Sequence, residues 1–287
     1  MSIKIKQYSS YASEKRLYDR IVRQCPFGNK WKDIEFTLGN QYDYILCYGS
    51  VPRNVDYKKI IFYNIEQSNH RKKLDDKVKN IKEEFFWYNN HLKHKIPPAW
   101  YHGETYTRLS KEVKKNKILS AVISGNNVII GHRLRIEVLK QLNELDYLDH
   151  YGRRPMGFMR KNKNYKGALE KKSDGLLPYK YTFNCENEFV SDIVSEKLYD
   201  GILCECLTFY DGCTNANEFV NEEAFIKVNV REPYETKEII EKSIKDNEWE
   251  KRLPIIKQEK ERLLNEYNFC NTIYKIVHGE QIKGFKD

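Results

Sequence analysis

Short apolar runs alternate with longer segments of helical periodicity, and this alternation constrains the fold of the 287-residue chain more than any other feature. Residues 42–49 and 59–66 are rich in aromatic and β-branched side chains, which favour buried strands. Similar runs recur later and predict further strands, at 117–124, 148–153, 179–187, 207–212 and 224–230. Strands that alternate with helices in this way are typical of α/β proteins, so we predict an α/β fold.

Amphipathic helices are predicted beside these strands. The first follows a turn at 125–127, and its apolar residues share one face: Leu134, Val138, Leu142 and Leu145. The second is expected to take Ser191 or Asp192 as its N-cap, ahead of a buried stripe formed by Val194, Leu198 and Ile202. The highly charged residues from Glu248 onward suit a closing helical segment, with Pro254 as a point of interruption.

A boundary between two units is predicted near residue 110. Pro97 and Pro98 break any helix, and the lysine-rich segment 111–117 follows them. That segment suits a linker or hinge, and a solvated helix is an equal alternative. We therefore predict a first domain at 1–110, a second at 111–245 and a C-terminal helical segment at 246–287.

Lysine and arginine exceed the acidic residues by 50 to 41, which leaves a net charge of +9. Such an excess favours anionic partners, a class that includes nucleotide phosphates, nucleic acids and anionic membranes. The basic residues are interspersed with acidic ones, and no zinc-finger or RNP motif accompanies them. We therefore predict no nucleic-acid partner, although a basic nucleic-acid binder stays open as an alternative.

The seven cysteines predict reduced structural thiols, because several lie in apolar, strand-like runs. Cys204 and Cys206 form a C-x-C pair, but no second pair of cysteines or histidines completes a zinc site. The histidines also lack metal-binding spacing, so we expect no metal. The first ten residues do not resemble a signal peptide, and no run approaches the ~20 apolar residues of a membrane span. We therefore expect a cytoplasmic protein without a transmembrane segment.

Two segments, 120–140 and 185–200, combine a strand, a turn and a helix start. Unpaired backbone N–H groups and the helix dipole favour an anion at such a position. Cations lie at both helix starts: Arg133 and Arg135 in the first, and Lys197 in the second. In open α/β sheets ligands bind at the carboxyl ends of the strands. The pattern indicates a nucleotide-phosphate site, and solvated surface charges are the alternative interpretation.

The segment 179–212 resembles the donor-binding signature of family 10 glycosyltransferases, the α1,3/4-fucosyltransferases. Cys185-Glu186-Asn187 and the run 192–197, DIVSEK, match the family's F-E-N and D-Y-V-T-E-K stretches. Flanking segments are similar in the same order, so the likeness covers about residues 40–235. Several positions depart from the family pattern: Gly125, Cys185, Ile193 and the stretch 204–212, which lacks the usual prolines. These departures concern the identity of the sugar donor more than the fold.

This resemblance implies a glycosyltransferase of the GT-B type, in which two Rossmann-like domains face a central cleft. Residues 1–110 would form the acceptor side and 111–245 the donor side. The implied enzyme is a soluble member of the bacterial or viral type that transfers L-fucose from GDP-fucose to a glycan hydroxyl with inversion. It requires no cofactor beyond the GDP-sugar donor. A different nucleotide sugar on the same fold is one alternative, and a non-catalytic nucleotide- or glycan-binding protein is another.

Donor-binding residues follow from the matched motifs. Arg135 would contact the donor diphosphate, and a gap in the match would assign that role to Arg133 instead. Lys197 would bind the same diphosphate, while Glu196 and Asn187 would hold ribose or sugar hydroxyls. Each has an ordinary alternative, since Asn187 suits a turn and Glu196 suits the first turn of any helix.

The catalytic base implied by the resemblance is Glu66, at the end of the apolar run 59–66. Inverting transfer needs a carboxylate that takes the proton of the attacking hydroxyl. Without the resemblance, a lone glutamate at a strand end is an ordinary solvated carboxylate. Three other carboxylates in the first domain are the next candidates: Glu35, Glu84 and Glu104.

Overall fold

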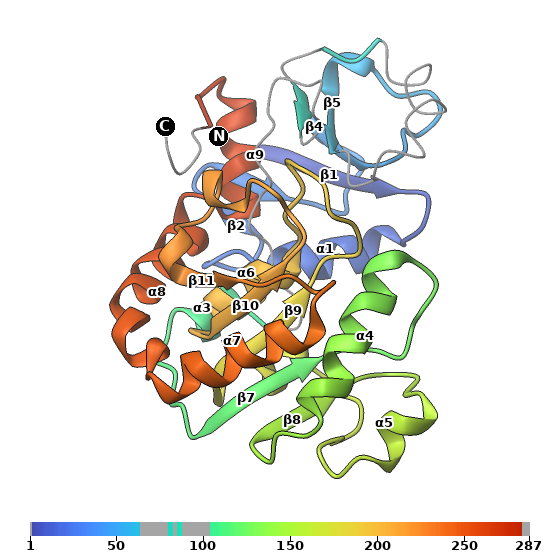
Figure 1. The fold of residues 1–287 in the computed structure, drawn as a ribbon. Helices are drawn as coiled ribbons and strands as arrows, with labels where there is room; N and C mark the ends of the chain where they lie inside the picture. The colour runs from blue at the N-terminus through green and yellow to red at the C-terminus, as the bar shows by residue number, and fades with distance from the viewer. Residues whose placement is uncertain (1, 64–79, 83–84, 88–103, 283–287) are drawn as a thin grey trace.

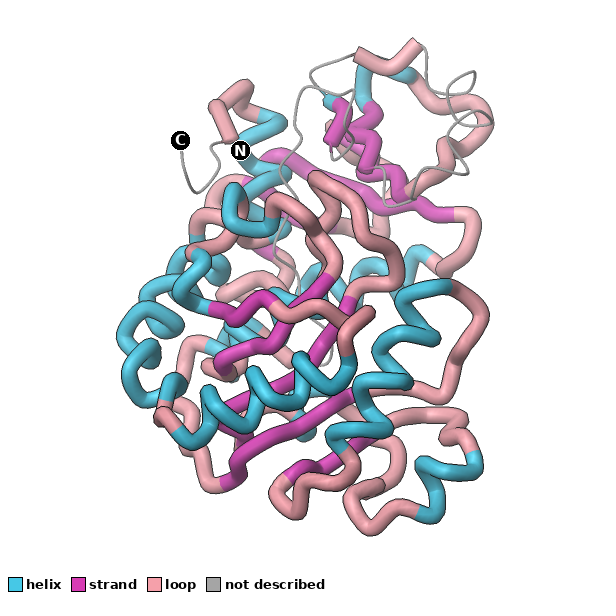
Figure 2. Tube along the Cα trace, viewed as in Figure 1, coloured by secondary structure: helices cyan, strands magenta, loops and turns pink. Residues whose placement is uncertain are grey.

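The computed structural model describes residues 2–63, 80–82, 85–87 and 104–282. Within them the chain forms two β-sheets with helices packed around them, which confirms the predicted α/β fold (Figure 1). The strands of each sheet gather into a separate layer (Figure 2). Each sheet has its own cluster of buried apolar side chains.

The first sheet has six strands in the order β2-β3-β1-β4-β5-β6. Every neighbouring pair is parallel except β2 with β3. The chain adds β3 on one side of β1 and then β4 on the other, so the strand order reverses between β1 and β4. The strand bounds are Ile3–Ser9 for β1, Lys30–Trp31 for β2, Ile34–Phe36 for β3, Tyr44–Tyr48 for β4, Ile60–Tyr63 for β5 and Phe86–Trp87 for β6.

The second sheet has five parallel strands in the order β11-β10-β9-β7-β8. Their bounds are Lys117–Val122 for β7, Leu148–Tyr151 for β8, Tyr179–Cys185 for β9, Leu207–Asp211 for β10 and Phe225–Lys227 for β11. The strand order reverses between β7 and β9, because β8 lies outside β7 and all later strands lie on the other side. Ligands of open α/β sheets bind at such a reversal, outside the carboxyl ends of the strands.

Small side chains define one face of the second sheet, and they let a helix approach closely. Ser120, Thr182 and Thr208 are fully buried there. Gly201 of α6 (Glu196–Leu203) lies so near that a Cβ would sit 2.1 Å from Thr208 Oγ1. Helix α8 (Glu248–Asn265) packs outside α6 and against β10.

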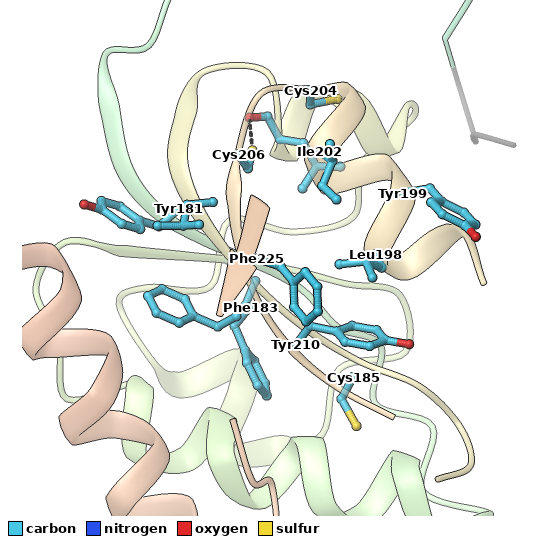
Figure 3. Packing of buried hydrophobic residues seen from close by; sticks show 14 of the residues in the cluster. Tyr181, Phe183, Cys185, Leu198, Tyr199, Ile202, Cys204, Cys206, Tyr210 and Phe225 are labelled. Atoms are coloured by element: carbon cyan, nitrogen blue, oxygen red, sulfur yellow. Dashed lines mark hydrogen bonds between the residues drawn. The ribbon is translucent and has the colours of Figure 1, made fainter. Parts of the chain in front are cut away.

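Aromatic side chains define the opposite face, which α4 (Ile130–Leu142) and α7 (Pro233–Lys245) cover together. Tyr181 and Phe209 stack with ring centroids 5.9 Å apart. The Tyr181 hydroxyl donates to the carbonyl of Ser243 in α7 and accepts from Trp249 N. Figure 3 shows how the buried side chains of β9, β10, β11 and α6 gather around the centre of this domain.

The two ends of the chain meet in the first core. Helix α9 (Phe269–Val277) contacts β2 and the end of α1 (Glu14–Val22), which itself packs on β1. Phe269 stacks on Tyr48 at 6.1 Å between centroids, and Cys270 Sγ lies 3.5 Å from Cys25 Sγ. The C-terminal helical segment therefore starts on the second domain with α8 and ends in the core of the first with α9.

Two local predictions need correction, and at the lysine-rich segment one of the two alternatives is excluded. Helix α6 takes Ser195 as its N-cap, not Ser191 or Asp192, because the Ser195 hydroxyl accepts from Lys197 N at 3.3 Å. Asp192 instead has a left-handed backbone, with φ at 62°. Pro254 does not interrupt α8, which runs continuously from Glu248 to Asn265. The segment 111–116 contains no helix and crosses between the domains as irregular chain beyond α3 (Tyr106–Leu109).

Candidate functional site

A cavity of about 470 Å³ opens at the carboxyl ends of β7 and β9, where the strand order of the second sheet reverses. Strand ends, helix starts and the loop before β9 all contribute to its wall. Several of its polar lining residues are charged: Arg135, Arg153, Glu170, Lys172, Glu196 and Lys197. The cavity thus concentrates cations at the place where the fold is expected to bind a ligand.

Arg135 lies on α4 and lines the cavity with only 7% of its surface exposed. Its Nη1 donates to Asn187 Oδ1 at 3.3 Å, whereas its Nε has no hydrogen-bond partner in the described part of the chain. Burial lowers the pKa of Arg135, with Cys185 and Glu186 opposing, but a guanidinium stays charged in proteins. Arg135 therefore offers a buried, charged N–H group to an incoming acceptor atom.

Arg133 belongs to the same helix but is exposed. Residues two apart on an α-helix point to nearly opposite sides, so both arginines cannot face one cavity. Arg133 is also not among the residues that line the cavity. The geometry therefore favours Arg135 as the arginine available to a ligand there.

Lys197 lies in the first turn of α6, where the helix dipole adds positive potential. Its Nζ lies 3.4 Å from Glu186 Oε2, 3.3 Å from Glu196 Oε1 and 3.1 Å from Ser195 Oγ. Burial lowers the pKa of Lys197, but the two carboxylates outweigh burial, and the net pKa is raised above its usual value. Lys197 therefore keeps its charge in a partly desolvated position.

Asn187 and Glu196 also lie at the cavity region, on two different elements. Glu196 lines the cavity from the first turn of α6, and Asn187 contacts Arg135 just beyond β9. The Asn187 carbonyl accepts from Gly131 N at 3.2 Å. A Cβ on Gly131 would lie 2.2 Å from the carbonyl oxygen of Glu186, so glycine is needed for α4 to approach β9 this closely.

His132 adds no positive charge near neutral pH. Burial lowers its pKa first, and the cations Arg135 and Lys197 lower it further, while a hydrogen bond with Asn187 opposes them. The imidazole is therefore mostly neutral, and the positive charge around it comes from Arg135 and Lys197.

Sequence reasoning missed Glu186, Arg153 and Lys172. Glu186 is 1% exposed and contacts Lys197, and the signal for it was its place directly before Asn187 in the matched motif. Arg153 and Lys172 line the cavity from the segment between β8 and β9. Their proximity to Arg135 depends on how the loop between β8 and β9 folds over the sheet.

Glu66 and Glu84 lie outside the described residues, so their predicted roles rest on the sequence. Of the other two candidate bases, Glu104 is 9% exposed and accepts from Ser173 Oγ at 3.1 Å. Glu35 lies within β3 and pairs with Lys30. Both carboxylates therefore have structural partners away from the cavity.

Tyr63 at the carboxyl end of the first sheet interacts electrostatically with Glu196 at the start of α6. Tyr63, the last residue of β5, is buried, and burial is the main cause that raises its pKa. Tyr11 and Glu196 raise the pKa of Tyr63 further through their charges. The end of β5 and the start of α6 therefore lie within electrostatic range of each other.

The described residues contain neither a cluster of metal ligands nor a membrane-spanning helix. No group of three or more His, Cys, Asp or Glu side chains within residues 2–63, 80–82, 85–87 and 104–282 is placed to hold a metal. Among the helices of the same ranges, none combines the length and apolar character needed to cross a bilayer. All seven cysteines are buried and unbridged.

Two stacked Rossmann-like domains, with a cationic cavity at the strand reversal of the second, define the GT-B class of fold. Solved structures agree. The chain is similar to a glycosyltransferase from Rickettsia africae ESF-5, with a TM-score of 0.55, 11% identity and coverage of 96% of this chain and 99% of that one. It is also similar to TarM, with a TM-score of 0.52 and 11% identity over 82% of this chain and 54% of that one.

An α1,3-fucosyltransferase solved with GDP aligns over 98% of this chain and 92% of its own length, with a TM-score of 0.48 and 13% identity. No protein-family model matches the sequence, and no curated protein matches it either. The likeness to the Rickettsia glycosyltransferase and to TarM supports the α/β, GT-B fold.

Proposed function

We propose that the protein is an inverting glycosyltransferase that moves a sugar from a nucleotide-sugar donor to a glycan hydroxyl. The observation that carries the proposal is that Arg135 and Lys197, two largely buried cations from different helices, line the same cavity. The motif resemblance in 179–212 favours GDP-fucose as the donor. The acceptor side is assigned to residues 1–110 and the donor side to 111–245.

The two cations suit the chemistry of the leaving group. Cleavage of the bond between sugar and nucleoside diphosphate builds negative charge on the diphosphate, and preorganised cations stabilise that charge without reorganising. The unpaired Nε of Arg135 supplies a donor that a phosphate oxygen can satisfy. Glu196 and Asn187 provide acceptors and donors for hydroxyls of the ribose or the sugar.

Glu66 is proposed as the general base on the basis of the sequence. It follows the carboxyl end of β5 by three residues, and Tyr63 at that strand end interacts electrostatically with Glu196 of α6. A carboxylate in this position would take the proton of the acceptor hydroxyl as the hydroxyl attacks the anomeric carbon. A single displacement of this kind inverts the anomeric configuration.

The donor class can be tested with a panel of nucleotides in a thermal-shift assay. A ligand that binds only the folded state raises the apparent stability, so GDP and GDP-sugars should raise the unfolding midpoint more than UDP or ADP compounds do. A larger shift with UDP would keep the glycosyltransferase proposal and replace the donor. A panel that leaves the midpoint unchanged throughout would contradict the donor site.

The catalytic role is tested with Glu66→Gln, which keeps size and hydrogen bonding but removes the basic oxygen. We expect GDP binding as in the wild type and a loss of sugar transfer on the order of a hundred-fold or more. Glu137→Gln, an exposed carboxylate of α4 paired with Lys140, is the matched control. Near wild-type transfer by Glu66→Gln would exclude Glu66, and the same substitution at Glu35, Glu84 and Glu104 would follow. GDP binding without any transfer in the wild type would instead indicate a non-catalytic nucleotide-binding protein.

A further inference from the structure

Glu186 is a carboxylate without a role in the mechanism described so far, although it lies directly behind Lys197. It follows β9 and is 1% exposed. A buried carboxylate is costly unless several donors satisfy it. Its donors therefore indicate what it holds in place.

Two elements supply these donors, the start of α6 and β10. Ser195, the N-cap of α6, donates from its backbone N at 2.9 Å to Oε1 and from its hydroxyl at 2.6 Å to Oε2. Tyr210 of β10 donates from its hydroxyl at 3.1 Å. Lys197 completes the set, with its ammonium 3.4 Å away. The end of β9, the end of β10 and the start of α6 thus meet on one carboxylate.

Backbone geometry makes room for this arrangement. Gly212, just after β10, has φ at 146°, a conformation that L side chains rarely adopt. A Cβ at this position would lie 2.3 Å from both Cβ and Cγ of Glu186. The glycine therefore lets the loop after β10 close against the Glu186 side chain and confine it.

We propose that Glu186 is a positioning residue, which fixes the first turn of α6 and holds the Lys197 ammonium charged and directed at the donor diphosphate. This role rests on the proposed function, because it assigns the diphosphate to Lys197. Glu186 is not among the residues that line the cavity, whereas Lys197, which it contacts, is one of them.

The charged and titratable groups around Lys197 determine how its ammonium responds to a change at Glu186. Glu186 and Glu196 raise the pKa of Lys197, whereas burial and Arg135 on α4 lower it. Cys185 on β9 and His132 on α4 are the other titratable neighbours coupled to Lys197. With the charge of Glu186 removed, burial and Arg135 would oppose Glu196 alone, so the pKa of Lys197 should fall.

Glu186→Gln tests this through the pH dependence of GDP binding. Glutamine keeps the shape and one acceptor oxygen for Ser195 N and the Tyr210 hydroxyl, while an NH2 group replaces the second oxygen, so the negative charge is removed with little change in volume. As pH rises from 7 to 10, Lys197 should lose its proton earlier in the variant, and phosphate affinity should fall with it. The protonation of GDP itself changes with pH in the same way for the wild type and the variant. The ratio of the variant Kd to the wild-type Kd at each pH therefore reports the protein alone. We expect this ratio to grow about ten-fold or more across that range.

Two further variants separate positioning from general damage. Glu205→Gln removes the charge of another buried pair in the same domain, in which Glu205 lies 2.7 Å from Lys260 and away from the cavity. Its Kd ratio should stay independent of pH. Lys197→Arg in the Glu186→Gln background should also restore a flat ratio, because a guanidinium does not deprotonate in this range. A Glu186→Gln ratio that stays flat with pH would overturn the proposal.

A titration of ¹³C-labelled lysines by NMR tests the same inference without any nucleotide. The Lys197 signal, assigned by its loss in Lys197→Arg, should titrate at lower pH in Glu186→Gln than in the wild type. An unchanged Lys197 titration would contradict the role of Glu186. A wild-type protein that binds no GDP would contradict the proposed function instead, so the two failures are distinguishable.

Discussion

At the scale of single residues, burial separates side chains that the sequence leaves equivalent. Arg133 and Arg135 are both basic residues at the start of a helix that follows a strand. The fold buries Arg135 beside Asn187 and leaves Arg133 exposed. A desolvated guanidinium with an unpaired N–H binds an anion more strongly than a solvated one does, because water competes less for it.

Alanine substitutions at these two arginines test the assignment. Arg135→Ala should weaken GDP binding by about 10- to 100-fold, since a hydrogen bond to a charged group contributes about 1.5–3 kcal/mol. Arg133→Ala should change the affinity by no more than about two-fold, as expected for a screened surface charge. Isothermal titration calorimetry on both variants measures the difference. The reverse order of effects would transfer the diphosphate role to Arg133.

At the scale of elements, the site depends on how closely α4 approaches the end of β9. Gly131 N donates to the Asn187 carbonyl at 3.2 Å, and this contact brings Arg135 and Asn187 together. On the other side of the sheet end, Ser195 caps α6 and aligns Lys197. Two helix starts from opposite faces of the sheet are therefore fixed at one strand end.

Gly131→Ala tests the close approach of α4. The added Cβ would meet the carbonyl oxygens of Glu186 and Asn187 at 2.2 and 2.5 Å, so the helix must shift. We expect a loss of roughly 1–3 kcal/mol in the free energy of unfolding, the range for overpacked positions, and weaker GDP binding. Gly157→Ala is the matched control, since its Cβ would meet no atom within 4 Å. Denaturant unfolding of both variants gives the comparison, and equal stabilities would disprove the close approach.

At the scale of the whole molecule, the chain crosses between the two domains twice. It leaves the first domain through residues 104–116 and returns to it with α9 after α8. Tyr106 Oη also donates to Asn265 Oδ1 at 2.8 Å, so the two crossings touch each other. This double connection ties the domains together even if one crossing is cut.

Limited proteolysis tests the double connection. Lys111 and Lys114 are exposed in the irregular crossing, so trypsin should cut there in the absence of donor. Denaturing gels should show two fragments of about 13 and 21 kDa, in proportion to their shares of the 34.4 kDa chain. On gel filtration the fragments should nevertheless elute together, because α9 stays in the first core. Fragments that separate readily would contradict the packing of α9.

Phe269→Ala provides the counterpart to that experiment. Phe269 is 2% exposed and packs on Tyr48 and Tyr63, so its loss should cost about 3–5 kcal/mol of packing free energy. The nicked variant should dissociate at lower denaturant concentrations than the nicked wild-type protein. Equal dissociation midpoints would indicate that other contacts hold α9.

Local patterns were enough to predict the α/β class, because a buried parallel strand must be apolar and a covering helix must be amphipathic over a few residues. The runs at 117–124 and 179–187 contain β7 and β9, and the helical pattern after 125–127 contains most of α4. The positions of Arg135 and Lys197 near helix starts could also be predicted, because helix starts have a local sequence signature. Glu66 stays a prediction, because it lies outside the described residues.

The rest was decided by contacts between residues far apart in the sequence. The proposed role of Glu186 depends on its hydrogen bonds with Tyr210 and with Ser195, the N-cap of α6. No local sequence pattern predicts that these three residues meet. Ser195 is the cap because its hydroxyl lies between Glu186 and Lys197 N, whereas Asp192 turns into a loop. The return of α9 to the first core depends on apolar packing. Because such packing is non-directional, the sequence of α9 does not indicate which core it joins.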